Sequence, residues 1–391
     1  MSILKKQTIL GKIIFEERRT IDKIDFALYY VDMRLKTILG KEKPVNIKDV
    51  AELAGVSPAT VSRVINNRTW VKEETRIKVS KAIESLGYVP NNSARNLSRM
   101  KTDIIGVIIA NPHDSLYTDI TFSEIIKGIG EIIDQEGYGL LLSKCNGRYI
   151  NFKSLPNMVN KRFIDGLILG GYPIEDRYIK ALCSQISPLV VIGRYLREGE
   201  IYRILIDNVG GGFKATEHLI NLRYKRIGII IGPRSIYAFE DKLKGYKKAI
   251  EDYGMSIDDS LIIEEQNYRG EGGYMGMKRI LSLSPIPDAV FVGDLLMALG
   301  AVKCVREYGL RIPDDIAIVG YCDNEIARLT DVPLTTININ ERNIGHAAAR
   351  LMLDIITEKV TSPIDITIST ELVIRDSCGS KRKGGDKNQL L

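Results

Sequence analysis

The segment from Val45 to Asn66 limits the possible folds of this chain more than any other stretch. Asn46 is a favourable N-cap, and Asp49 is placed as its reciprocal partner in a capping box, so a helix begins here. Gly55 falls where that helix must stop, because a residue without a Cβ turns there at little cost. Ser57 can cap a second helix. The sequence therefore predicts two short helices joined by a tight turn.

The second helix is predicted to bury Val61 and either Val64 or Ile65. Its exposed face carries Pro58, Ala59, Ser62, Arg63 and Asn66. Such a face suits the major groove of DNA, where arginine can bind guanine through two hydrogen bonds and asparagine can pair with adenine or a phosphate. The alternative is an ordinary helical hairpin whose outer face is only solvated.

The residues after this pair extend the pattern. A third helix is predicted from Val71 to Leu86, with an apolar stripe that ends at Gly87. Residues 88–102 are polar and basic, and Ala94 and Leu97 are the only aliphatic residues between positions 91 and 101. The sequence thus predicts a three-helix unit over 45–90 and a polar hinge over 91–102.

This region resembles the DNA-binding headpiece and hinge of the lactose-repressor family of bacterial transcription regulators. The matching strings are Ile-Lys-Asp-Val-Ala, Gly-Val-Ser, Ala-Thr-Val-Ser-Arg-Val-Ile-Asn, Glu-Glu-Thr-Arg and Gly-Tyr-x-Pro-Asn-x-x-Ala-Arg-x-Leu. The resemblance implies a recognition helix with Ala59, Arg63 and Asn66 near base edges and Ser57, Thr60 and Ser62 near phosphates. It also implies a hinge helix that forms on DNA and wedges Leu97 into the minor groove.

The residues expected to contact DNA lie in the headpiece and the hinge. They are Asn46, Ser57, Pro58, Ala59, Thr60, Ser62, Arg63, Asn66, Ala94 and Leu97. The charge distribution agrees, since residues 45–101 carry a net charge of +5 whereas residues 102–378 carry −6. A basic head on an acidic body attracts phosphates at one end only.

Residues 103–378 show apolar runs that alternate with amphipathic helical patterns. The runs are 104–109, 138–143, 166–170, 189–193, 226–232, 289–293 and 316–320. This alternation predicts an α/β body of two doubly wound parallel-sheet lobes, and ligands bind beyond the carboxyl ends of such strands. The whole fold class is therefore an α-helical helix-turn-helix headpiece followed by this two-lobed α/β body, and the family resemblance implies that the body is of the periplasmic-binding-protein type.

The family resemblance continues to about Asp376, through strings such as Asp165-Gly-Leu-Ile, Met297-Ala-Leu-Gly and Val319-Gly-Tyr. It implies a body that closes on a small molecule and mediates dimerisation. Lobe 1 would span about residues 103–206 and 339–363, and lobe 2 about residues 207–338 and 364–378. The chain would cross between the lobes near Asp207, Asn338 and Pro363.

The likeness breaks where an effector would bind. Members that bind sugars or purines usually carry arginine at the position of Lys242, and Cys322 replaces an acidic or amide residue. A thiol accepts hydrogen bonds weakly, so it cannot replace a carboxylate that holds sugar hydroxyls. Asp294 either binds a ligand or pairs with Lys242. The candidate effector-binding residues are Asp114, Ser115, Phe122, Arg194, Lys242, Asp294 and Cys322.

These departures predict that common neutral sugars do not bind tightly. Control by an anionic metabolite, by a partner protein or by nothing small is expected instead, so the effector is a small molecule or a protein of unknown identity.

Other chemistry has little support in the sequence. Five scattered cysteines predict reduced thiols in a cytoplasm, and three separated histidines give no metal cluster. The glycines at 210–212 and 270–273 invite a phosphate-loop interpretation, but neither run completes a motif, which favours turns or tight helix starts. No catalytic arrangement, cofactor site or membrane span of about 20 apolar residues is predicted. An enzyme on the same scaffold is therefore disfavoured, and so is a periplasmic ligand-binding protein.

Two terminal segments lie outside the family pattern. Residues 21–38 place apolar side chains at spacings of three and four, which predicts an amphipathic helix. Within residues 1–44, this segment is either an extra dimerisation or docking helix or a stretch upstream of a true start at Met33. The basic tail, 379–391, is expected to be disordered.

The function expected from all of these features is that of a cytoplasmic transcription regulator. It would be a homodimeric repressor, or a tetramer, on a palindromic double-stranded DNA operator.

Overall fold

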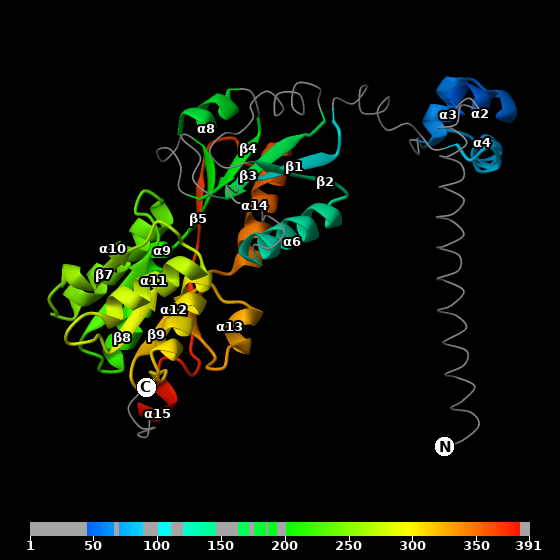
Figure 1. Cartoon of the computed structure of the whole chain (residues 1–391). Helices are drawn as coiled ribbons and strands as arrows, with labels where there is room; N and C mark the ends of the chain where they lie inside the picture. The colour runs from blue at the N-terminus through cyan, green and yellow to red at the C-terminus, as the bar shows by residue number, and fades with distance from the viewer. Residues whose placement is uncertain are drawn as a thin grey trace, which may run out of the picture. The chain divides into compact units, whose positions relative to one another are not determined.

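The computed structural model describes residues 45–65, 70–88, 101–110, 120–145, 163–171, 176–184, 187–193 and 201–383 (Figure 1). The chain divides into two compact units, residues 1–98 and 99–391, and each is described by itself. The predicted N-terminal helix at 21–38, most of the hinge and the tail beyond residue 383 lie outside the described residues. No helix of the described ranges has the length and apolar character needed to cross a bilayer.

The first unit contains the predicted helix pair and a third helix. These are α2 (Ile47–Ala54), α3 (Pro58–Ile65) and α4 (Glu73–Leu86). The capping box is present: the Asn46 side chain accepts from Lys48 N at 2.8 Å, and Asp49 accepts from Asn46 N at 2.7 Å. Gly55 adopts a left-handed conformation with φ 63° and ends α2.

A small core holds these helices together. Val50, Val61 and Val79 are fully buried, one from each helix, and Val71 packs against this core before α4 begins. The third helix starts at Glu73 rather than at the predicted Val71, because Lys72 has extended backbone angles and occupies the N-cap position. The predicted boundary is therefore two residues early.

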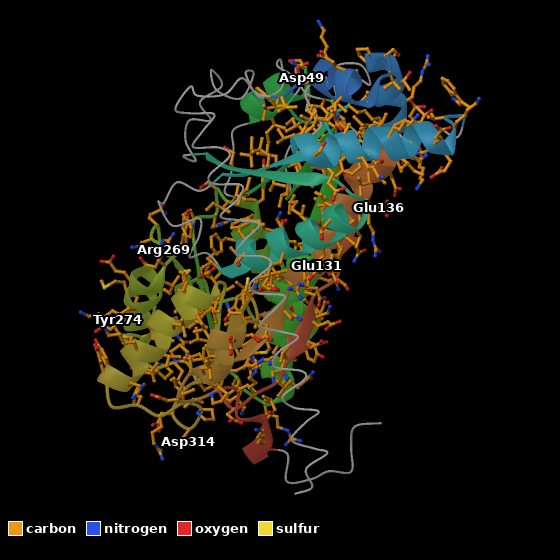
Figure 2. The ribbon with its side chains drawn as sticks, turned by 90° about the vertical axis from the view of Figure 1, so that its right-hand side faces the viewer. Asp49, Glu131, Glu136, Arg269, Tyr274 and Asp314 are labelled. Carbon is orange, nitrogen blue, oxygen red and sulfur yellow. The ribbon has the colours of Figure 1, made fainter. Side chains whose placement is uncertain are left out.

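Lobe 1 of the second unit is built on a six-stranded, fully parallel sheet in the order β11-β5-β4-β3-β1-β2. Its strands are β1 (Ile104–Ala110), β2 (Gly139–Cys145), β3 (Gly166–Gly171), β4 (Leu189–Ile192), β5 (Tyr202–Ile206) and β11 (Asp365–Ile368). Its helices are α6 (Ile120–Gln135), α8 (Asp176–Cys183) and α14 (Glu341–Ile356). Helix α14 packs on the central strands and against α6, on which Figure 2 labels Glu131; Glu136 directly follows that helix.

Lobe 2 has a second six-stranded sheet in the order β12-β10-β9-β8-β6-β7, parallel except for its edge strand β12. Its strands are β6 (Ile227–Ile231), β7 (Ile262–Glu264), β8 (Ala289–Val292), β9 (Ala317–Tyr321), β10 (Thr335–Asn338) and β12 (Glu371–Val373). Its helices are α9 (Asn208–Asn221), α10 (Tyr237–Asp252), α11 (Gly270–Leu281), α12 (Leu295–Glu307), α13 (Glu325–Leu329) and a 3-10 turn, η2 (Asp259–Leu261). The glycine runs at 210–212 and 270–273 lie in the first turns of α9 and α11.

The chain passes between the two sheets three times. The first passage follows β5 at Asp207, and the second follows β10 before α14. The third lies between β11 and β12, near Ser369, and not near Pro363 as the sequence predicts. The prediction is wrong because residues 365–368 pair with β5 of lobe 1, where Asp365 accepts a hydrogen bond from Arg203 Nε at 2.7 Å.

The start of the C-terminal tail also differs from expectation. Residues 380–383 form a helical turn, α15, rather than a disordered segment. Lys381 Nζ lies 2.6 Å from Asp376 Oδ1, and Gly379 turns the chain with φ 77°. The expected disorder overlooks this local ion pair and turn.

The glycines at the α6–α14 contact show how closely the helices approach. A Cβ at Gly128 of α6 would collide with the backbone carbonyl oxygen of Arg342, and one at Gly345 of α14 would collide with that of Ile125. By contrast, a Cβ at Gly130, two residues further along α6, would meet nothing within 4 Å. The two glycines of α6 therefore have different roles.

We expect Gly128→Ala to lower the free energy of unfolding of the body by about 1–3 kcal/mol, because the added methyl group forces α14 away. The matched variant Gly130→Ala should raise it by about 0.5–1 kcal/mol, because alanine loses less backbone entropy in a helix. Urea unfolding of both variants checks this. Equal effects would contradict the proposed helix contact.

Candidate functional site

The exposed face of α3 is the first candidate site. Ser57, Pro58, Ala59 and Arg63 are exposed, whereas Val61 and Val64 are buried, as the sequence predicts. Thr60 and Ser62 are half-buried, so Ser62 is less exposed than the sequence predicts. Ser57 Oγ accepts a hydrogen bond from Thr60 N at 3.1 Å and lies 2.9 Å from Thr60 Oγ1, so it caps the helix. The short helix thus presents the predicted mix of small and basic residues.

The remaining residues predicted to contact DNA are Asn46, Asn66, Ala94 and Leu97. The Asn46 side-chain oxygen is used in the capping box, so this residue has a structural role. Asn66, Ala94 and Leu97 lie outside the described residues. Trp70 was not predicted at all, yet its ring lies under the guanidinium of Arg63, with Cζ 4.5 Å from the ring centroid.

The second candidate site is a cleft of about 410 Å³ between the two lobes of the body. It lies at the carboxyl ends of strands from both sheets: Gly193 follows β4, Asp207 follows β5, Asp294 follows β8 and Cys322 follows β9. This is the position that the doubly wound pattern predicts. Phe122, Lys242, Asp294 and Cys322 of the predicted set line it, whereas Asp114, Ser115 and Arg194 lie outside the described residues.

Lys242 is a buried cation at the floor of this cleft. Its residue is only 6% exposed, and Nζ donates a hydrogen bond to the carbonyl oxygen of Gly293 at 2.9 Å. The same nitrogen lies 3.9 Å from the ring centroid of Tyr321 and 4.9 Å from that of Phe239. Burial lowers the pKa of the Lys242 ammonium, while the nearby thiol and carboxylate act in the opposite direction. Lys242 is therefore already partnered within the protein, which weakens the charge argument for an anionic effector.

Asp294 occupies the N-cap of α12. Its Oδ1 accepts hydrogen bonds from Leu296 N at 2.8 Å and from Met297 N at 3.2 Å. The sequence offered two interpretations of Asp294, ligand binding or pairing with Lys242. It did not predict this capping role. The side chain consequently has a structural function at the edge of the cleft.

Cys322 sits in a conformation that side chains rarely adopt. Its φ of 70° is in the left-handed region, which asparagine and aspartate tolerate better than other side chains. Burial raises the pKa of its thiol well above the ordinary value, so the group is a neutral, weak acceptor at pH 7. The position thus lacks the carboxylate that the family pattern places there.

The next residue, Asp323, cannot take over this role. Its carboxylate pairs with Arg375, with Oδ1–Nη1 and Oδ2–Nη2 distances of 2.6 and 2.9 Å, and also accepts from Thr336 Oγ1 at 2.7 Å. Burial by itself would raise the pKa of Asp323. The hydrogen bonds from Arg375 and Thr336 and the charge of Arg375 outweigh this effect, so the net shift of the pKa is downward. Asp323 therefore fixes the end of β9 to the C-terminal segment.

Several described cleft residues were missed from the sequence. They are Asp207, Asp241, Tyr237, Phe239, Tyr268 and Tyr321. Among the described residues that line the cleft, three are aspartates and one is a lysine. The lining also offers aromatic faces, against which an uncharged ligand can pack.

A helix-turn-helix unit followed by a two-lobed body with a cleft defines the class of DNA-binding regulators that carry a ligand-binding domain. Residues 46–91 match the model of the bacterial regulatory proteins of the lacI family, and residues 216–378 match the periplasmic binding protein-like domain. The HTH-type transcriptional regulator CelR of Thermobifida fusca is 34% identical over 331 residues, 84% of this chain and 96% of that protein.

Two solved structures are similar over most of the chain. A transcriptional regulator CelR–cellobiose complex superposes with a TM-score of 0.66 at 32% identity and covers 85% of this chain and 99% of its own. The lac repressor dimer bound to operator and the anti-inducer ONPF superposes with a TM-score of 0.75 at 28% identity, covering 86% and 99%. The chain belongs to the lacI family and is a DNA-binding transcriptional regulator, not an enzyme.

We expect Arg375→Met to lower the free energy of unfolding by about 3–5 kcal/mol, because it leaves the buried Asp323 carboxylate unpaired. Arg311→Met is the control: it breaks a two-point pair with Asp315, but the Arg311 side chain is 70% exposed, so the loss should be below about 1 kcal/mol. Urea unfolding at neutral pH compares the two.

The effect should depend on pH. Because the folded-state pKa of Asp323 is lowered, its stabilisation is present above the ordinary carboxyl pKa and is lost as the pH falls through the folded value. The difference between wild type and Arg375→Met should therefore shrink in acid. A constant difference would contradict the assigned ion pair.

Proposed function

We propose that the protein represses transcription as a homodimer on a palindromic operator, with one α3 helix in the major groove of each half-site. The observation that supports this most directly is the exposed face of α3, which carries Arg63 among small side chains on a folded helix-turn-helix unit. Ala59 and Arg63 would approach base edges, while Ser57, Thr60 and Ser62 would approach phosphates. The roles of Asn66, Ala94 and Leu97 remain predictions from the family resemblance.

A second copy of the chain is the proposed occupant of the outer face of lobe 2. Large apolar side chains are exposed on α11 to α13 and at the C-cap of α12: Met275, Leu296, Tyr308 and Leu329, the last at 76%. Figure 2 labels Tyr274 at the outer edge of the same face. A dimer would bury this apolar surface, and the lac repressor superposed on this chain is itself a dimer on operator DNA.

The cleft is proposed to bind a small uncharged ligand with an apolar face and several hydroxyl groups. Phe122, Tyr237, Phe239 and Tyr268 offer aromatic surface, and the CelR relative is known in complex with cellobiose. An anionic effector, which the sequence favours, is the rival. It has less support because the Lys242 ammonium is already partnered within the protein.

We expect Arg63→Ala to lose about 1–3 kcal/mol of binding free energy on the preferred operator and to relax the choice at one base position. Selection of duplexes from random sequence with the full chain identifies the operator, and binding titrations then compare the variant. Lys78→Ala, which removes one positive charge from α4, is the control and should keep the same base preferences. A selection that returns no two-fold symmetric motif would contradict the proposed function.

Cellobiose and other neutral disaccharides should raise the melting temperature of the protein and change its operator affinity, whereas sugar phosphates should do neither. A ligand at about 100 times its Kd stabilises a fold by about 2.7 kcal/mol, which gives a clear shift. Cys322→Asp should tighten neutral sugar binding, since aspartate tolerates the left-handed backbone and restores a carboxylate. Tighter binding of a phosphate ester than of any neutral sugar would favour the anionic rival.

A further inference from the structure

We propose that Trp70 is a positioning residue for base recognition, whose indole ring orients the Arg63 guanidinium toward one base pair of the operator. The proposal rests on the proposed base-reading role of Arg63. It concerns how selectively that side chain acts, and not whether the headpiece binds DNA at all.

Trp70 has no evident structural reason to be a tryptophan. The ring is 64% exposed, and it is absent from the headpiece core formed around Val50, Val61 and Val79. Its described contact is with Arg63, whose Cζ lies 4.5 Å from the ring centroid. An exposed ring contributes little to folding, so its position beside the one arginine of α3 points to recognition.

Both partners are attached to rigid elements. Arg63 follows the half-buried Ser62 on α3 and precedes Val64, which is 5% exposed and anchors the helix to the core. Val71, next to Trp70, packs against the same core just before α4. The backbone next to Trp70 is therefore anchored to the same core as the recognition helix, although the ring itself is open to solvent.

The contact chemistry is compatible with base recognition. The face of an indole attracts a cation through its quadrupole, and tryptophan does so best among the aromatic residues. This contact uses no N–H donor of arginine, so the donors remain available for a two-point contact with guanine. A long side chain that is ordered before DNA arrives loses less entropy on binding. Trp70 would therefore favour the correct base pair without contacting it.

Three roles of Trp70 give different results in a double-mutant cycle. A positioning residue acts only through Arg63, so its removal should have no effect once Arg63 is absent. A residue that contacts DNA itself loses binding energy in either background. A residue that only supports the fold lowers the melting temperature and weakens binding to every sequence equally.

The experiment uses the full chain and the duplex recovered by selection with the wild-type protein. Wild type, Trp70→Ala, Arg63→Ala and the double variant are titrated against that duplex and against duplexes with each base pair changed singly. We expect Trp70→Ala to lose about 2- to 5-fold of discrimination at the base pair that Arg63→Ala also relaxes, and little elsewhere. Trp70→Phe should retain part of it. In the Arg63→Ala background, Trp70→Ala should change nothing further.

The same loss in both backgrounds, or a uniform loss across all duplexes, would overturn the proposal. If Arg63→Ala itself keeps the wild-type base preferences, the proposed role of Arg63 fails instead, and the two failures are thus distinguishable. Trp70 is the single tryptophan of the chain, so its fluorescence gives an independent readout. Arg63→Ala should shift the emission of the free protein, and an unchanged spectrum would contradict the contact.

Discussion

The close approach of α9 and α10 is the constraint on which the ligand cleft depends. A Cβ at Gly212 of α9 would collide with the carbonyl oxygen of Lys242, and one at Gly245 of α10 would collide with that of Val209. The two backbones can therefore touch only because both positions are glycine. This contact fixes the first turn of α9, with the Asp207 cap, beside the turn of α10 that carries Lys242. Helix pairs α6–α14 and α11–α12 pack in the same way, so the cleft lining is held by rigid backbone on both lobes.

The parts of this fold that were predictable from sequence have local causes. The capping box at Asn46 and the left-handed Gly55 fix the helix-turn-helix because each acts within a few residues. The strands found in advance, such as β1 and β6, are continuous apolar runs in the sheet interiors. Strands β5, β7, β10 and β12 were missed. Strands β7 and β12 are only three residues long, and β5 and β10 include polar residues such as Arg203 and Thr336. Edge strand β11 is half-exposed, so its sequence does not show which sheet it joins.

The sequence predicted several of the residues that line the cleft, but not the contacts that these residues make with the rest of the protein. Phe122, Lys242, Asp294 and Cys322 meet in one cleft because each follows or faces a strand end. Nothing in the sequence shows, however, that Lys242 lies against Tyr321, which is distant along the chain, or that Asp323 is paired with Arg375. The contact of Trp70 with Arg63 was missed for the same reason. Pairings across a fold depend on topology, which local patterns do not encode.

Both lobes contribute residues to the cleft. Phe122 comes from lobe 1, whereas Lys242 and Cys322 come from lobe 2, so a ligand among them binds according to how the lobes are arranged. At the second passage between the lobes, Asn340 has a left-handed backbone, and burial raises the pKa of Glu341 to about 7, so the charged carboxylate is disfavoured there. Because the folded-state pKa of Glu341 is raised, its contribution to the stability of the fold is fully present below the ordinary carboxyl pKa. That contribution is lost as the pH rises through about 7. A ligand can shift such a balance only by the difference between its affinities for two arrangements.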